Sequence, residues 1–307
     1  MLPSLRNEIA AAARRIRPHV RRTPVVWVEL DGMPVLLKLE LLQHAGSFKP
    51  RGAFNRLLSG AVPEAGVIAA SGGNHGAAVA YVARALGVAA EIFVPESTPE
   101  TKTARIAGYG ARVVRTGAAY AEALAASRER QRVTGALEVH AYDDQFVLAG
   151  QGTLGRELEE QAPDLTHVLV ATGGGGLIGG VLGWYAGGAE VISVEPETCP
   201  TLHAALAAGR PVPVPVSGLA SDSLGARQVG DLMFPLAQAW CGGSLLVSDE
   251  AIRAAQRWLW EQVRLVAEPG GAVALAAVLS GTFRLPANAQ VGVVVCGANT
   301  DPGSVGS

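Results

Sequence analysis

Short, continuously apolar runs alternate with helical patterns along nearly the whole chain, and this alternation limits the possible folds more than any other feature. Seven runs have the length of a buried strand: Val35–Leu39, Val67–Ala70, Ala90–Val94, Ala111–Val114, Val168–Ala171, Val191–Val194 and Val291–Val295. Helical patterns separate many of them: His75–Leu86, Pro99–Ala107, Ala118–Val133, Thr153–Gln161 and Ala251–Val266. Strands without polar residues are typical of parallel sheets covered by helices. The pattern therefore predicts an α/β fold.

Glycine-rich loops follow several of these runs. The chain has 38 glycines in 307 residues, about 12% against about 7% in average proteins. Ligands of open α/β sheets bind at the carboxyl ends of strands, in loops that lead into helices. We therefore look for function in four such loops: Gly46–Gly52 (GSFKPRG), Ser71–Gly76 (SGGNHG), Thr172–Leu177 (TGGGGL) and Cys296–Asn299 (CGAN).

Lysine is scarce, and one of the three lysines lies in the first glycine loop. Arginine fills 22 of the 25 basic positions and leaves only Lys38, Lys49 and Lys102. Lys38 lies in an apolar strand and Lys102 on a helix turn that looks exposed, so neither belongs to a glycine loop. An arginine cannot replace a nucleophilic amine, because guanidinium does not deprotonate. Lys49 is therefore a candidate nucleophile, and an ordinary surface cation is the alternative.

Two of the loops have the composition of anion sites. Backbone N–H groups at a helix N-terminus bind anions, and Ser71–His75 and Gly173–Gly176 both open a predicted helix. Helix capping is the alternative for the first loop. For the second, Gly174-x-Gly176-x-x-Gly179 also fits a dinucleotide fingerprint, and Glu195 follows where a ribose-binding acid would lie. A P-loop is excluded because no lysine follows Lys102.

Charge and cysteine content exclude other classes of protein. The formal net charge of −2 gives no basic surface for nucleic acid or an anionic membrane. Three cysteines without a CxxC pair predict neither a disulfide framework nor a zinc site, so we expect a cytoplasmic protein. Leu165–Ala189 has 25 residues without a formal charge, enough to span a bilayer, but its nine glycines favour a strand, a loop and a helix.

Six motifs in a fixed order resemble the serine/threonine dehydratase and serine racemase family. These are pyridoxal-phosphate (PLP) dependent enzymes of fold type II, the fold of the tryptophan synthase β subunit. The resemblance covers about residues 20–301. The motifs are GSFKPRGA (Gly46–Ala53), SGGNHG (Ser71–Gly76), AGQGT (Ala149–Thr153), GGGGL (Gly173–Leu177), EPGGA (Glu268–Ala272) and CGAN (Cys296–Asn299).

The resemblance implies a role for each matching residue. Lys49 would form a Schiff base with the cofactor aldehyde, Phe48 would pack beside the ring, Asn74 would bind the ring hydroxyl, and Cys296 would face the pyridine nitrogen. The cofactor phosphate would bind to the backbone of Gly173, Gly174, Gly175, Gly176 and Leu177. The substrate carboxylate would bind to Ser71, Gly72, Gly73, Asn74 and His75.

The resemblance also implies the architecture. It predicts two lobes, each an open and mostly parallel twisted sheet flanked by helices, with the cofactor in the cleft between them. Residues 1–59 and 143–307 would form the large lobe, and residues 60–142 a smaller inserted lobe. Since relatives in this family are commonly dimers, the resemblance also implies a homodimer. We expect no C-terminal regulatory domain, because the catalytic pattern extends to Asp301.

The implied reaction is the α,β-elimination of a small β-hydroxy amino acid such as L-threonine or L-serine. Lys49 would remove the Cα proton, hydroxide would leave Cβ, and hydrolysis would release a 2-oxo acid and ammonia. The amine must be neutral, so its pKa must lie well below the value of about 10.4 of free lysine. The alternatives are a racemase or a β-replacement synthase of the same fold, although such synthases usually carry threonine at the position of His75. A dinucleotide-binding oxidoreductase is the alternative from another class.

Two positions depart from the family pattern. Racemases carry a second serine where this chain has Gly72, so we expect elimination to dominate over racemisation. Relatives bind a divalent ion through a glutamate, a backbone carbonyl and an aspartate, and here Glu195 and the Cys199 carbonyl are present but Thr201 replaces the aspartate. We therefore predict no tightly held metal ion. The substrate side chain is not determined by these motifs, although Tyr142 in the segment His140–Phe146 is a candidate wall of its pocket.

Overall fold

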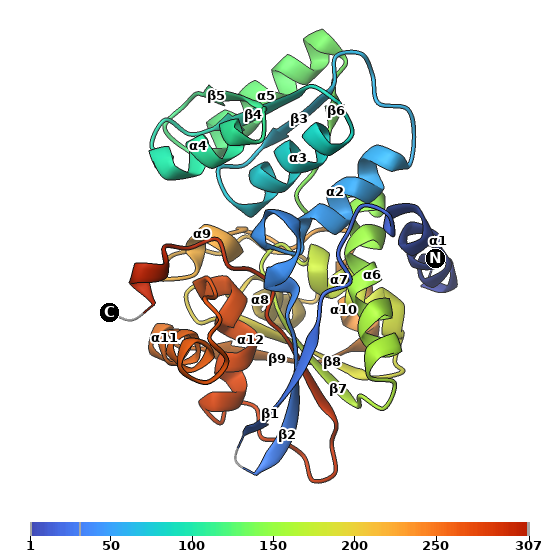
Figure 1. The fold of residues 1–307 in the computed structure, drawn as a ribbon, viewed down its shortest axis with the longest axis vertical. Coiled ribbons are helices and arrows are strands. Elements are labelled where there is room, and N and C mark those ends of the chain that lie inside the picture. The colour runs from blue at the N-terminus through green and yellow to red at the C-terminus, as the bar shows by residue number, and fades with distance from the viewer. Residues whose placement is uncertain (1, 31, 306–307) are drawn as a thin grey trace.

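Two separate sheets organise the chain in the computed structural model, which describes residues 2–30 and 32–305. The larger sheet has the strand order β1-β2-β10-β7-β8-β9, and the smaller has the order β5-β4-β3-β6. Figure 1 shows the smaller sheet, with helices α3, α4 and α5, above the larger one. The predicted α/β architecture with two helix-flanked sheets is confirmed.

Parallel pairing dominates both sheets. All neighbours are parallel except β1 and β2, which form an antiparallel hairpin at one edge of the larger sheet. The strands of the larger sheet are β1 (Val25–Leu30), β2 (Met33–Lys38), β7 (His167–Ala171), β8 (Glu190–Pro196), β9 (Cys241–Val247) and β10 (Val291–Val294). Those of the smaller sheet are β3 (Val67–Ala70), β4 (Ala90–Val94), β5 (Arg112–Arg115) and β6 (Leu137–Glu138).

All seven predicted strands are present, and three further strands were missed. β1 is an edge strand with a mixed burial pattern, β6 has only two residues, and β9 carries two glycines. None of the three has the continuous apolar character on which the prediction rested. The four strands of the smaller sheet all lie between β2 and β7 in the chain. The lobe boundaries at 59/60 and 142/143 stay a prediction.

Helices cover the sheets and connect their strands. Those before β7 are α1 (Leu2–Ile16), α2 (Lys49–Leu58), α3 (Asn74–Ala85), α4 (Glu100–Gly108), α5 (Tyr120–Thr134) and α6 (Gln145–Gln161). Those after it are α7 (Gly176–Tyr185), α8 (Thr201–Ala208), α9 (Ser221–Leu224), α10 (Phe234–Trp240), α11 (Asp249–Trp258) and α12 (Pro269–Leu279). Single 3₁₀ turns lie at Glu40–Leu42, His44–Gly46 and Pro302–Ser304, and a π-helical turn at Leu259–Val263 follows α11.

Helix α6 begins eight residues earlier than the sequence predicts. Asp144 caps it by accepting hydrogen bonds from the backbone N–H groups of Phe146 and Val147. The glycines in its first half weaken helix propensity, which explains the error. They also allow close packing, because a Cβ on Gly150 would lie 2.6 Å from the backbone oxygen of Arg51 in α2.

The uncharged segment Leu165–Ala189 divides into strand β7, a glycine loop and helix α7. Among the helices that the structure describes, none is long and apolar enough to cross a membrane. The segment is buried because α7 packs against α6 and α1 inside the protein. Its apolar residues are therefore part of the hydrophobic core.

Candidate active site

Lys49 lies at the first position of α2, where the loop from β2 meets the loop after β10. The backbone N–H of Phe48 donates to the Cys296 oxygen at 3.2 Å, and Ala298 N–H donates to the Gly46 oxygen at 2.9 Å. Two of the predicted loops are thus hydrogen-bonded to each other. Lys49 Nζ donates to the Ala141 oxygen at 2.8 Å and lies 5.0 Å from the Phe48 ring centroid.

The environment of Lys49 favours a neutral amine. Burial lowers the pKa of Lys49 from 10.5 to about 8, and proximity to Cys296 and Glu268 offsets part of this effect. Cys296 is itself buried, its Sγ lies 3.5 Å from the Gly270 oxygen, and burial raises the pKa of its thiol well above the ordinary value. The site therefore combines an amine that deprotonates readily with a thiol that stays neutral.

The loop Ser71–Gly76 leads from β3 into α3, which begins at Asn74. Ser71 Oγ accepts a hydrogen bond from Gly73 N–H at 3.2 Å. His75 Nε2–H donates to the Val139 oxygen at 2.7 Å. Burial, and then the charge of Lys49, lower the pKa of His75 to about 3. The imidazole is therefore neutral, and the loop presents backbone N–H groups and neutral side chains to the site.

Gly72 lies close to a neighbouring side chain of the same lobe. A Cβ on Gly72 would lie 2.8 Å from Thr98 Cγ2. Close packing therefore favours glycine at this position, where racemases of the family carry serine.

The glycine loop Gly173–Gly176 connects β7 to α7. Gly175 has φ +87°, a conformation that strongly favours glycine. Side chains and backbone enclose the loop, because added Cβ atoms at Gly174 and Gly175 would collide with Tyr142 and Met233 respectively. Within the described part of the chain, no hydrogen bond occupies the N–H groups of Gly173 to Leu177. These free N–H groups at a helix N-terminus are a suitable cradle for a phosphate.

The segment His140–Asp143 joins the lysine to the glycine loop. Its Ala141 oxygen accepts from Lys49, while Tyr142 lies against Gly174 and Gly176. His140 Nδ1 accepts from Asp143 N–H at 2.8 Å and stabilises the turn. Tyr142 therefore borders the candidate phosphate cradle, and its predicted role beside the substrate stays a prediction.

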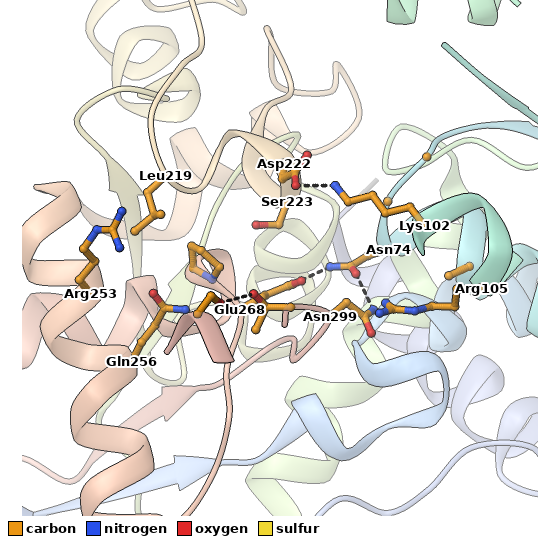
Figure 2. A pocket seen from close by; sticks show the side chains of 16 residues that line it. Asn74, Lys102, Arg105, Leu219, Asp222, Ser223, Arg253, Gln256, Glu268 and Asn299 are labelled. Atoms are coloured by element: carbon orange, nitrogen blue, oxygen red, sulfur yellow. Dashed lines mark hydrogen bonds and ion pairs between the residues drawn. The ribbon is translucent and has the colours of Figure 1, made fainter. Parts of the chain in front are cut away.

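Asn74 belongs to a hydrogen-bond network that the sequence did not reveal. Its Nδ2 donates to Glu268 Oε1 at 2.5 Å, and Asn299 Nδ2 donates to its Oδ1 at 2.6 Å. Figure 2 shows the three side chains in contact. Glu268 and Asn299 belong to the motifs EPGGA and CGAN, so the signal was present in the sequence, but nothing in it indicated a specific role.

A cavity of about 330 Å³ adjoins this network. Its lining includes Gly72, Gly73 and Asn74 from one lobe and Glu268 from the other. Lys102 forms an ion pair with Asp222 across it, as Figure 2 shows. Lys102 lies in α4, outside the four glycine loops as predicted, but its side chain is only 27% exposed and lines the same cavity as Gly72 and Gly73.

Glu195 is fully buried at the end of β8. Its carboxylate accepts hydrogen bonds from the backbone N–H groups of Leu202 and His203, both at 2.7 Å. Thr201 Oγ1 lies 3.0 Å from Glu195 Oε1 and 2.8 Å from the Gly173 oxygen. The carboxylate thus anchors the start of α8 and, through Thr201, contacts the glycine loop.

No group of three or more His, Cys, Asp or Glu side chains suited to a metal ion occurs in residues 2–30 and 32–305. The expectation of no tightly bound ion remains a prediction.

Comparisons with known proteins agree with this geometry. A family model described as "Pyridoxal-phosphate dependent enzyme" matches residues 16–297. An L-threonine ammonia-lyase of Geobacter sulfurreducens is 41% identical, with 89% of this chain and 70% of the relative covered. A phenylserine dehydratase of Ralstonia pickettii is 36% identical, with 98% of this chain and 94% of the relative covered. The solved structure of maize serine racemase matches with a TM-score of 0.92 and 32% identity over 98% of this chain and 95% of the other.

Proposed function

Because the chain belongs to the family of pyridoxal-phosphate dependent enzymes, we propose that it is an ammonia-lyase acting on a small β-hydroxy amino acid such as L-threonine or L-serine. The products are the corresponding 2-oxo acid and ammonia. The observation that carries the proposal is the place of Lys49, where the loops after β2 and β10 are hydrogen-bonded to each other and its Nζ donates to the Ala141 oxygen at 2.8 Å. Burial there lowers the pKa of the amine to about 8. The similarity to an L-threonine ammonia-lyase over most of both chains supports the reaction class.

The residues of the site fit pyridoxal phosphate. The free N–H groups of the Gly173–Leu177 segment would hold its phosphate, Phe48 would lie beside the ring, and Asn74 and Cys296 would contact the ring hydroxyl and nitrogen. When bound, the cofactor supplies an aldehyde for covalent attachment and an electron sink for charge that develops at Cα. A neutral Cys296 thiol gives the ring nitrogen a hydrogen-bond partner without a negative charge.

Lys49 supplies the base. As a neutral amine it takes the Cα proton onto Nζ, and its contact with the Ala141 oxygen orients the lone pair and the N–H groups. A pKa of about 8 leaves a substantial fraction of the amine neutral near pH 7.5, which an ordinary lysine would not provide.

The substrate carboxylate binds at the N-terminus of α3. Ser71, Gly72 and Gly73 lead from β3 into this helix, and His75 in its first turn is neutral because its pKa is lowered to about 3. Gly72 offers no side chain for protonating Cα, so elimination should dominate over racemisation, the alternative suggested by the serine racemase relatives.

The test measures the ammonia and 2-oxo acid that are released from L-threonine and L-serine. It also measures the D-serine that is formed from L-serine. We expect 2-oxo acid as the main product and loss of activity in both Lys49→Ala and Lys49→Arg. The arginine variant is the matched control because it retains the charge but cannot deprotonate. Activity in Lys49→Arg, or D-serine without pyruvate, would contradict the proposal. The homodimer and the cytoplasmic location stay predictions, and light scattering tests the first.

A further inference from the structure

Glu268 is a buried carboxylate that the proposed mechanism does not use. It precedes α12, at a position where a short polar side chain usually bonds to the free N–H groups of the helix. Glu268 makes no such capping bond, and its side chain turns toward Asn74. Only 5% of the residue is exposed. Burying a carboxylate is costly unless hydrogen bonds compensate, so its partners indicate what it does.

The donor that the carboxylate accepts from lies in a distant segment. Asn74 Nδ2 donates to Oε1 at 2.5 Å, and the nearby backbone of Asn299 favours the ionised form of the carboxylate. Asn299 Nδ2 then donates to Asn74 Oδ1 at 2.6 Å and to the Ala45 oxygen at 2.8 Å. The starts of α3 and α12 and the loop after β10 meet in this network, which Figure 2 shows beside the cavity.

The network determines which way the amide of Asn74 points. An ionised carboxylate only accepts hydrogen bonds, so it must face the NH₂ group of Asn74, and the NH₂ group of Asn299 must face the amide oxygen. One N–H of Asn74 Nδ2 has no partner among residues 2–30 and 32–305. We propose that Glu268 is a positioning residue, which holds Asn74 so that this N–H donates to the bound cofactor. The proposal rests on the proposed function, because it takes Asn74 as a cofactor contact.

Protonation of Glu268 should disturb the arrangement. A proton on the carboxyl removes the charge that strengthens the bond from Asn74, and a proton on Oε1 would face the NH₂ group of Asn74. Burial raises the pKa of Glu268 to about 7, although the bond from Asn74 and the nearby backbone of Asn299 counteract the rise.

The charged groups around Glu268 come from several elements. Arg105 of α4 favours the ionised form, and Asp222 of α9 opposes it. Lys49 of α2 and the thiol of Cys296 also interact with it electrostatically. Since the ionised carboxylate holds the NH₂ group of Asn74 most strongly, the positioning should be complete well above pH 7 and lost as the pH falls through this value.

The test is the dissociation constant of pyridoxal phosphate, measured between pH 6 and pH 8 by fluorescence or absorbance with the full chain. If protonation of Glu268, with its pKa of about 7, prevents binding, the affinity for pyridoxal phosphate should be about tenfold weaker at pH 6 than at pH 8. Glu268→Gln replaces one carboxylate oxygen by an NH₂ donor. The variant therefore imitates the protonated carboxyl, and it does so at every pH because the amide does not titrate. We expect this variant to bind more weakly at pH 8 and to lose the tenfold change.

Controls separate positioning from general stability. Glu261→Gln, which alters an exposed carboxylate seven residues earlier, should behave like the wild type. If Glu268→Gln fails to fold, Asn299→Ala is measured instead, and we expect weaker binding that keeps its pH dependence, because Glu268 remains.

Two results would overturn the proposal: wild-type pH dependence in Glu268→Gln, or unchanged affinity in Asn299→Ala. Failure of the wild type to release ammonia would instead refute the proposed function, since cofactor binding is measured without substrate.

Discussion

Chemical labelling of the unliganded protein tests the electrostatics of Lys49 directly. Acetic anhydride reacts with neutral amines, and the chain has only three lysine side chains, so each can be followed separately by peptide mass spectrometry. Lys49 is half-buried beside the site, and burial lowers its pKa from 10.5 to about 8. We expect its rate of acetylation to be half-maximal near pH 8.

The size of the effect follows from the two pKa values. At pH 7.5 an amine with a pKa of about 8 is roughly 24% neutral, whereas one with a pKa of 10.5 is roughly 0.1% neutral, a ratio on the order of 200. Lys38 is the internal control for access, because it is 0% exposed and its Nζ donates to the Thr23 oxygen at 2.8 Å. It should stay unlabelled while the protein is folded.

The assay uses trace acetylation from pH 6 to pH 11, followed by complete labelling with an isotopic reagent after unfolding. Prior incubation with pyridoxal phosphate should protect Lys49. A half-maximal rate near pH 10.5 for Lys49 would refute the electrostatic argument, and so would labelling of Lys38 faster than Lys49. The first result would mean that water reaches the ammonium freely.

Further predictions concern stability, the phosphate cradle, specificity and metal ions. Lys38→Met removes the Lys38 partner of the Glu157 carboxylate at 2.5 Å, while Arg51 still pairs with it, so urea denaturation should show a loss of about 1.5–3 kcal/mol in the free energy of unfolding. Gly175→Ala forces a side chain into φ +87° and a contact of 2.7 Å, so titration should show at least tenfold weaker cofactor binding; unchanged affinity would rule out the phosphate role. Gly72→Ser places its Cβ 2.8 Å from Thr98 Cγ2, and chiral chromatography should therefore detect increased D-serine only when Thr98→Ser is added. Chelation should leave the rate of ammonia release and the melting temperature unchanged, and a large loss of either would indicate a bound ion.

The architecture was predictable because its signals are local. A parallel strand that helices cover on both faces must be apolar throughout, and this is visible within four to seven residues. The same reasoning failed for β9, whose two glycines break the apolar pattern, although pairing with β8 supplies its hydrogen bonds. It also failed at the start of α6, where close packing against α2 outweighs the low helix propensity of glycine.

The environment of Lys38 shows where local reasoning ends. A lysine within an apolar strand gives no indication of its partner, and Glu157 is 119 residues away in the chain. In the structure the two form a buried ion pair, joined by Arg51, which also pairs with Glu40. The sequence indicated only that Lys38 lies outside the glycine loops.

By itself, the sequence determined the alternation of seven strands with helices, the four glycine loops and the lysine among them, because periodicity and glycine content act within a few residues. Only the tertiary structure decided which buried polar groups meet. Glu268 and Asn74 are 194 residues apart, and Asn299 and Asn74 are 225 apart. A hydrogen bond depends on separations of about 3 Å, and such separations between distant segments arise only when the two sheets and their helices pack together.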